Sequence, residues 1–151
     1  MSLKHVAPGM IADPSAMFGL IALQKNANSY SEQAVQAITT AGTASVITAA
    51  QLYAGVIQLN TGASGGFTLT LPTTALILAQ FGTTFLTDGQ FSKWITIINN
   101  NVGQTATLTA GDASTTITGT ATIATNTVRQ YLLNITSATT ITLTNCGSLT
   151  L

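Results

Sequence analysis

Hydrophobic and polar residues alternate along much of the chain from residue 42 onward. The clearest case is residues 67–71, where Phe67, Leu69 and Leu71 are separated by threonines. Successive side chains of a strand point to opposite faces, so this alternation predicts a strand whose three apolar side chains face a core and whose threonines face outward. Pro72, which cannot donate to a strand ladder, ends it.

Seven further segments share a richness in β-branched residues and lie between turn residues. Thr, Val and Ile suit a pleated surface and lose side-chain freedom in a helix, so we predict strands rather than helices. The predicted strands are 56–59, 91–98, 106–109, 115–118, 121–123, 127–135 and 139–145. Turns recur about every 8 to 12 residues, which is typical of an antiparallel sandwich or barrel.

Three of these segments lead to more specific predictions. The dense run of Trp94, Ile95 and Ile97 predicts a strand buried on both faces, either in the middle of a sandwich or at an interface. The turn residues 99–103 predict a hairpin into the strand at 106–109. Similar Thr-x-Thr-Leu-Thr and Ile-Thr-Leu-Thr segments recur without a fixed period, so the pattern does not indicate a solenoid.

One short helix is expected inside the β-rich region. Residues 75–80 follow Thr73 and Thr74, which can cap a helix, and precede Gly82, which can end one. The predicted fold class is therefore all-β, an antiparallel β-sandwich with one short helix.

Residues 1–41 have a different character. Pro8-Gly9 and Asp13-Pro14 favour extended or turning chain. The apolar residues of this part follow no sustained period, and residues 31–38 form a candidate short helix capped by Ser29 or Ser31. We expect an extended N-terminal arm over 1–41 that docks onto a capsid or a neighbouring subunit, followed by a β-sandwich domain over 42–151. The alternative is an unattached tail, although tails rarely carry so many large apolar residues.

Charged residues are scarce, and this changes the expected function. They make up 5% of the chain, against about 25% in ordinary domains, and the net charge is zero. No basic footprint for nucleic acid or for an anionic membrane is present. A monomer with so few charges is expected to be poorly soluble, which favours a surface buried against partners over a surface covered only by Thr, Ser and Asn.

Cellular location follows from what the sequence lacks. No apolar run approaches the roughly 20 residues of a membrane-spanning helix, and no secretory signal opens the chain. The single cysteine, Cys146, excludes an internal disulfide. We therefore expect synthesis in a host cytoplasm.

Candidate catalytic groups are few. His5 is the only histidine, and we expect it to be a contact residue rather than part of a catalytic triad. Asp88 and Asp112 each adjoin a glycine and fit turns, although a glycosidase pair built from them remains an alternative. The acids are too scattered for a calcium loop, and only a metal site on an oligomer axis stays open. The prediction is a protein that is not an enzyme and has no catalytic, cofactor-binding or metal-binding residues.

Several segments together resemble a known group of proteins. The order of Leu69-Thr70-Leu71-Pro72-Thr73, Ile97-Ile98-Asn99, Thr107-Leu108-Thr109-Ala110-Gly111 and Ile141-Thr142-Leu143 is similar to that in capsid decoration and head-fibre proteins of tailed phages and in structural proteins of large DNA viruses. The resemblance covers residues 48–145. It implies a jelly-roll-like sandwich, commonly a trimer on the capsid surface, with no catalytic residues to carry over.

We therefore expect a virion structural protein on the capsid surface that self-associates, as a homotrimer, and is anchored to the major capsid protein or another virion protein. Nucleic acid, membrane and cofactors are not expected partners. The residues expected to build its core and interfaces are Met17, Phe18, Leu20, Ile21, Phe67, Leu69, Leu71, Trp94, Ile95 and Ile97. Two alternatives remain: a receptor- or glycan-binding fibre module using aromatics such as Tyr53, Trp94 and Tyr131, and a polysaccharide depolymerase.

Overall fold

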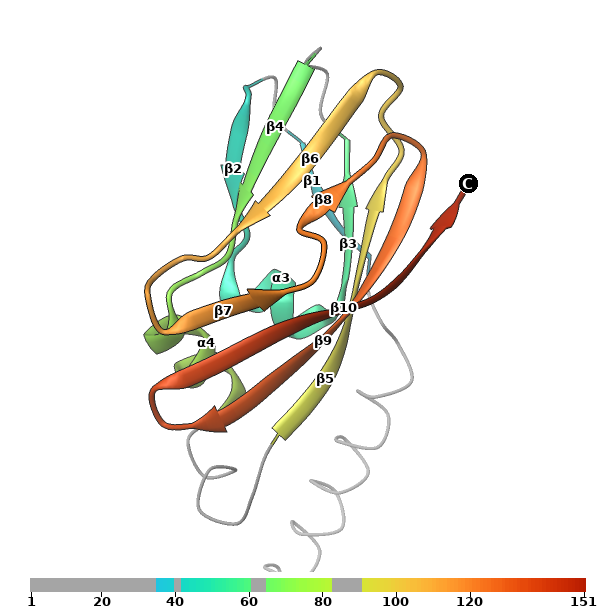
Figure 1. Ribbon diagram of the computed structural model, residues 1–151. Coiled ribbons are helices and arrows are strands. Elements are labelled where there is room, and N and C mark those ends of the chain that lie inside the picture. Colours follow the sequence, from blue (N-terminus) through green and yellow to red (C-terminus); the bar gives the residue numbers. More distant parts are fainter. Residues whose placement is uncertain (1–34, 40–41, 61–64, 83–90) are drawn as a thin grey trace, which may run out of the picture. The chain divides into compact units, whose positions relative to one another are not determined.

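The computed structural model describes residues 35–39, 42–60, 65–82 and 91–151. The chain divides into two compact units, Met1–Gln33 and Ala34–Leu151, and all described residues belong to the second. This second unit, the β-body, is built mostly from strands with two short helices (Figure 1). The predicted β-rich class is confirmed.

The strands of the β-body form two sheets. Sheet A has the order β1 (Val35–Ile38), β3 (Val56–Leu59), β5 (Phe91–Asn99), β9 (Thr127–Ser137), β10 (Thr140–Thr150) and β7 (Thr115–Thr118). Sheet B has the order β2 (Ala44–Val46), β4 (Gly65–Thr70), β6 (Gln104–Thr109) and β8 (Thr122–Ile123). Strand β1 lies before residue 42, so the β-body starts earlier than the domain boundary that the sequence suggested.

The first six strands alternate between the two sheets and stack in parallel. In sheet A, Val56 of β3 lies between Val35 of β1 and Thr96 of β5. In sheet B, Thr68 of β4 lies between Ala44 of β2 and Thr107 of β6. The chain therefore winds through three coils, each of which gives one strand to each sheet.

Antiparallel pairing is confined to the strands that cover the third coil. Strand β9 pairs antiparallel with β5 and β10, and β8 pairs antiparallel with β6, whereas β7 joins β10 in parallel. The prediction of an antiparallel sandwich is therefore wrong for the coils, and their parallel strands depart from a jelly roll. The sequence did not indicate a solenoid, and the three parallel coils are the main correction.

The turn after β5 is a corner between the sheets and not a hairpin, because β5 belongs to sheet A and β6 to sheet B. Asn99, fully buried, holds this corner. Its side-chain amide donates hydrogen bonds to the carbonyl oxygens of Gln104 at 2.9 Å, Ile123 at 3.1 Å and Ala124 at 3.0 Å.

Two helices connect sheet B back to sheet A. Helix α3 (Ala49–Ala54) follows β2 and begins with a capping box in which Thr48 and Gln51 bond to each other's backbone N–H. Helix α4 (Thr74–Phe81) follows β4, close to the predicted position. The described residues thus form two helices where one was expected. The candidate helix at 31–38 is wrong for Val35–Ile38, which form β1; its first residues lie outside the described part.

The core lies between the sheets. Phe67, Leu69 and Leu71 are at most 2% exposed, as the alternation predicted, and Ile95 and Ile97 are fully buried beside them. Trp94, by contrast, points away from the core and is 53% exposed. The middle of a sandwich is therefore wrong for β5 within this unit, and burial of its outward side chains at an interface stays a prediction.

Candidate interaction surface

The outward side of sheet A forms a continuous surface of uncharged side chains. Residues that are partners in neighbouring strands share a face, so the register places them in rows across the sheet. One row is Ala37, Gln58, Ile98, Val128 and Leu149. A second row is Val35, Val56, Thr96, Gln130 and Gly147. A third is Trp94, Leu132, Thr144 and Thr118. We call these three rows the outer face of sheet A.

This face exposes large apolar side chains. Val35 is 54% exposed, Trp94 53% and Leu149 69%. Single exposed apolar residues are normal on any protein, but several on one uncharged sheet face are typical of an interaction surface.

The charged side chains of the described residues lie elsewhere. Lys93 faces inward from β5, where its ammonium lies 4.9 Å from the ring centre of Tyr53 and partial burial lowers its pKa. Arg129 alternates with the outward Val128 and Gln130, and Asp112 lies in the loop before β7. No charge from the described part therefore opposes an approaching surface at the outer face.

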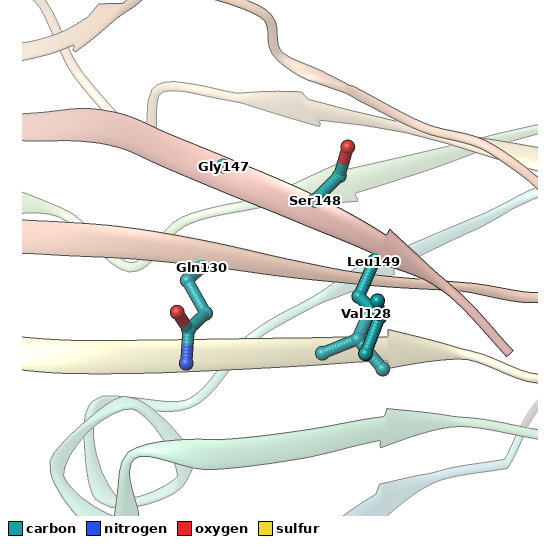
Figure 2. A pocket seen from close by; sticks show the side chains of 5 residues that line it. All are labelled: Val128, Gln130, Gly147, Ser148 and Leu149. Carbon is teal, nitrogen blue, oxygen red and sulfur yellow. The ribbon is translucent and has the colours of Figure 1, made fainter.

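A shallow hollow of about 290 Å³ interrupts the outer face near its edge (Figure 2). It lies over Gly147, and an added Cβ there would meet nothing within 4 Å. The register of β9 and β10 shifts between Asn145 and Gly147, and Gly147 has a φ of 147°, which side chains other than glycine rarely adopt. Val128, Gln130, Ser148 and Leu149 complete the lining, with Val128 and Leu149 side by side in Figure 2.

Asp112, one member of the suggested acid pair, has a structural role. Its carboxylate accepts hydrogen bonds from the backbone N–H of Thr74 at 2.6 Å and the Thr74 hydroxyl at 2.8 Å. The backbone N–H of Ser114 and the hydroxyl of Thr115 also donate to it, at 3.0 and 3.3 Å. These bonds, that from the Thr74 N–H above all, lower the pKa of Asp112. Asp112 thus caps α4, whose own N-cap, Thr73, makes no side-chain capping bond.

The other proposed chemical groups are not brought together in the described part. His5, Asp13, Glu32 and Asp88 lie outside the described residues. Within those residues, no group of three or more His, Cys, Asp or Glu side chains is close enough to hold a metal ion. The acid pair of Asp88 and Asp112, an alternative to turn roles for both residues, is untested because Asp88 lies outside the described residues.

The aromatic side chains that a glycan-binding module would use are dispersed. Tyr131 is fully buried, its hydroxyl donates to the carbonyl of Thr120 at 3.2 Å, and burial raises its pKa to about 12. Tyr53 packs edge-on against Phe81 on the side of β5 toward which Lys93 points. Trp94 points to the opposite side, so Tyr53 and Trp94 do not form one groove.

Of the expected core and interface residues, five build the core and one, Trp94, lies on the outer face. Met17, Phe18, Leu20 and Ile21 lie outside the described residues. Sequence reasoning missed Val35, Gly147 and Leu149. Only the alternation of Val128, Gln130 and Leu132 in β9 hinted at a second, partly apolar face.

Comparisons with known proteins do not assign this chain to a family: no protein-family model, curated protein or solved structure matches it. No helix of the described part is both long and apolar enough to cross a membrane.

Proposed function

We propose that this protein is a structural subunit of a virus particle, a decoration or head-fibre component, that works by binding copies of itself and the capsid. The observation that carries the self-association is the outer face of sheet A, which is uncharged and exposes Val35, Trp94 and Leu149. The virion setting rests on the resemblance of residues 48–145. The proposal requires only two packed sheets, as in the expected sandwich, and does not require that their strands be antiparallel.

The size of the outer face supports an interface. Neighbouring strands lie about 4.8 Å apart and each residue advances about 3.3 Å, so each residue in the six strands of sheet A covers roughly 16 Å² on one side of the sheet. One face therefore offers about 700 Å², and two such faces in contact bury about 1,400 Å², within the range of stable interfaces. Sheets pack face to face in this way in many proteins.

A second copy of this chain is the partner that we propose for the outer face. Two identical uncharged faces meet without like-charge repulsion, and the neutral net charge removes the long-range repulsion between copies. Contact between two identical faces joins two copies about a two-fold axis, whereas the homotrimer that the resemblance implies requires a contact between two different surfaces. We therefore propose the homotrimer on the resemblance alone, and the outer face as a contact that joins two copies. The anchor to the major capsid protein or another virion protein is assigned to the N-terminal unit.

A charge placed in the middle of the outer face tests this proposal. Thr96→Lys puts an ammonium in the row between Val56 and Gln130, where contact with a second face would desolvate it. We expect the wild-type chain to sediment as an oligomer and the variant to shift toward monomer. Thr107→Lys is the matched control, because Thr107 is exposed on the outward side of sheet B.

Sedimentation velocity and native mass measurement report the result. Both variants should keep the wild-type circular dichroism spectrum, which separates loss of assembly from loss of folding. A wild-type chain that stays monomeric at its highest soluble concentration overturns the self-association proposal. A Thr96→Lys oligomer equal to that of the wild type removes the outer face as its site.

A further inference from the structure

We propose that the free edge of β10, residues 147–150, pairs with the same edge of a second copy about a two-fold axis at Ser148. This inference rests on the proposed self-association and adds a specific contact and register to it. The contact is an antiparallel strand pair, so it is separate from the face-to-face contact of sheet A. In a trimeric assembly it would join copies from neighbouring trimers.

Among the described strands, only β7 lies along this edge, and it covers only part of β10. The parallel pairing of β7 with β10 runs from Ile141 to Thr144. Figure 1 shows β10 continuing past β7 to its end, where β9 is its neighbour on one side. No described strand lies along the other side of residues 147–150, and all four residues are exposed.

The backbone along this edge offers hydrogen bonds. The N–H of Leu151 donates to the carbonyl of Asn126 at 2.8 Å, beside β9. Along an antiparallel strand, residues whose backbone groups bond to one neighbouring strand alternate with residues whose backbone groups point to the opposite side. Leu149 lies two residues before Leu151, so its backbone groups also point toward β9. The backbone N–H and C=O groups of Ser148 and Thr150 therefore face away from β9, toward the free edge.

Little in this segment protects the edge against pairing. Natural edge strands are guarded by lysines, prolines, inward-pointing charges or bulges. Residues 140–151 contain no charged residue and no proline. The bulge at Cys146 lies before the free segment and leaves residues 147–150 in regular register with β9.

The side chains select one register among those that the backbone allows. A two-fold axis at residue 147, 148 or 149 brings the backbone groups at the free edge of one copy opposite those of the other copy. Only the axis at Ser148 places Leu149 of each copy opposite Gly147 of the other. Gly147 has no side chain and lies under the hollow of about 290 Å³, which gives the exposed leucine a place to be buried. The contact forms twice by symmetry, as in other two-fold interfaces.

A second copy is favoured as the occupant because this edge complements itself. Leu149 and Gly147, which would lie opposite each other in the two copies, are two residues apart on one strand, and both line the hollow. Pairing also joins two copies of sheet A into one sheet of twelve strands, so the two uncharged outer faces become continuous. The edge contact therefore enlarges the surface to which the proposed function assigns assembly.

Cysteine cross-linking in the full-length chain tests the register. Ser148 is the residue that faces its own copy, and opposed residues in a hydrogen-bonded antiparallel pair have Cα atoms about 5.5 Å apart, within disulfide range. We expect Ser148→Cys, made with Cys146→Ser, to become mainly a disulfide-linked dimer under mild oxidation. Thr150→Cys with Cys146→Ser is the matched control and should stay largely unlinked, as should the wild-type chain through Cys146.

A further substitution tests the leucine contact. Leu149→Lys added to the Ser148→Cys chain should abolish the cross-link, because an ammonium cannot be buried in the hollow without cost. Val102→Lys is its control, since Val102 is 87% exposed in the corner after β5. An unchanged cross-link in the Leu149→Lys chain refutes the register.

The remaining outcomes separate the two proposals. Equal cross-linking at 148 and 150 indicates random collision and overturns the edge contact. A chain that sediments as an oligomer but never cross-links at 148 overturns the edge contact and leaves the proposed function standing. A chain that is monomeric throughout overturns both.

Discussion

Asn99 and Asp112 are single polar side chains that each join segments far apart in the sequence. Asn99 bonds to three carbonyl groups from two later segments, and Asp112 bonds to Thr74, 38 positions earlier in the chain. Both replace backbone pairing at places where the chain leaves a sheet. Their hydrogen bonds therefore support the corners of the coils.

Asn99→Asp tests the first corner. The aspartate keeps the shape but has no N–H to donate, so the three carbonyl groups that share the two N–H donors of Asn99 lose them, and a carboxylate is buried beside them. Each buried unsatisfied group costs about 1–3 kcal/mol, so we expect the free energy of unfolding to fall by about 3 kcal/mol or more. Urea unfolding measures it.

Asn134→Asp is the matched control for this substitution. The Asn134 side-chain oxygen accepts a hydrogen bond from the hydroxyl of Ser92 at 2.6 Å, and an aspartate can still accept it. We expect a change of less than about 1 kcal/mol. Equal losses for the two variants would show that the donors of Asn99 do not hold the corner.

Asp112 predicts a pH dependence of stability. Its hydrogen bonds, chiefly from the Thr74 N–H, hold its pKa in the folded protein below the ordinary value of 3.8. A lowered pKa contributes stability that is fully present above about pH 4 and is lost as the pH falls through the folded-state value. Asp112→Asn should therefore lower the thermal midpoint at pH 7, and its difference from the wild type should shrink at acid pH.

Thermal unfolding of both chains between pH 7 and pH 2.5 measures this difference. The other carboxylates titrate in both proteins, so subtracting the two curves isolates Asp112. A difference that stays constant across the range would show that the charge of Asp112 does not stabilise the cap of α4.

At the scale of elements, the sequence pattern predicted those strands and helices that depend only on neighbouring residues. The strand at Phe67, Leu69 and Leu71 was predictable because alternation follows from the geometry of one strand. Helix α3 was missed, although the Thr48-x-x-Gln51 capping box at its start is a recognised signal. Its six residues bury only Leu52, so no hydrophobic period accompanied the signal.

The parallel coils were not predictable from periodicity because their lengths differ. Val35 and its partner Val56 are 21 positions apart, whereas Val56 and its partner Thr96 are 40 apart. The second coil includes α4 and residues 83–90 in addition to its strands. A search for a fixed repeat therefore finds none, even though the strands stack in register.

The prediction of a hairpin after β5 was wrong for a reason that lies outside the turn residues. Residues 99–103 are turn formers in either arrangement. Strand β5 is already paired on both sides, with β3 and β9, so no edge of it is left for β6. The choice between hairpin and corner is made by strands distant in the sequence.

At the scale of the whole molecule, the low charge content has a structural counterpart in the uncharged outer face. Trp94 was identified from the sequence, but its position at the surface depends on which sheet β5 joins. Leu149 and Gly147 gain their significance from the bulge at Cys146 and from the end of β7 at Thr118. Such features arise from strand order and cannot be found in a local window.

The proposed function gives the two units separate roles, attachment for Met1–Gln33 and folding for Ala34–Leu151. The described strands and helices all lie in the unit Ala34–Leu151, so deletion of residues 1–33 removes none of the strand pairing seen among the described residues. We expect the shortened chain to keep its strand-type circular dichroism spectrum and its urea midpoint, and to lose attachment to particles. The deletion removes the apolar side chains to which we assign anchoring, namely Met17, Phe18, Leu20 and Ile21.

Co-sedimentation with particles that lack the wild-type chain measures attachment, and the full-length Thr107→Lys chain serves as a control that should still bind. Because the outer face is intact in the shortened chain, its self-association should persist while attachment is lost. Shortened chains that still bind particles would move the anchoring role to the β-body, where the outer face of sheet A would be the first surface to substitute. Shortened chains that neither fold nor associate would show instead that residues 1–33 stabilise the β-body.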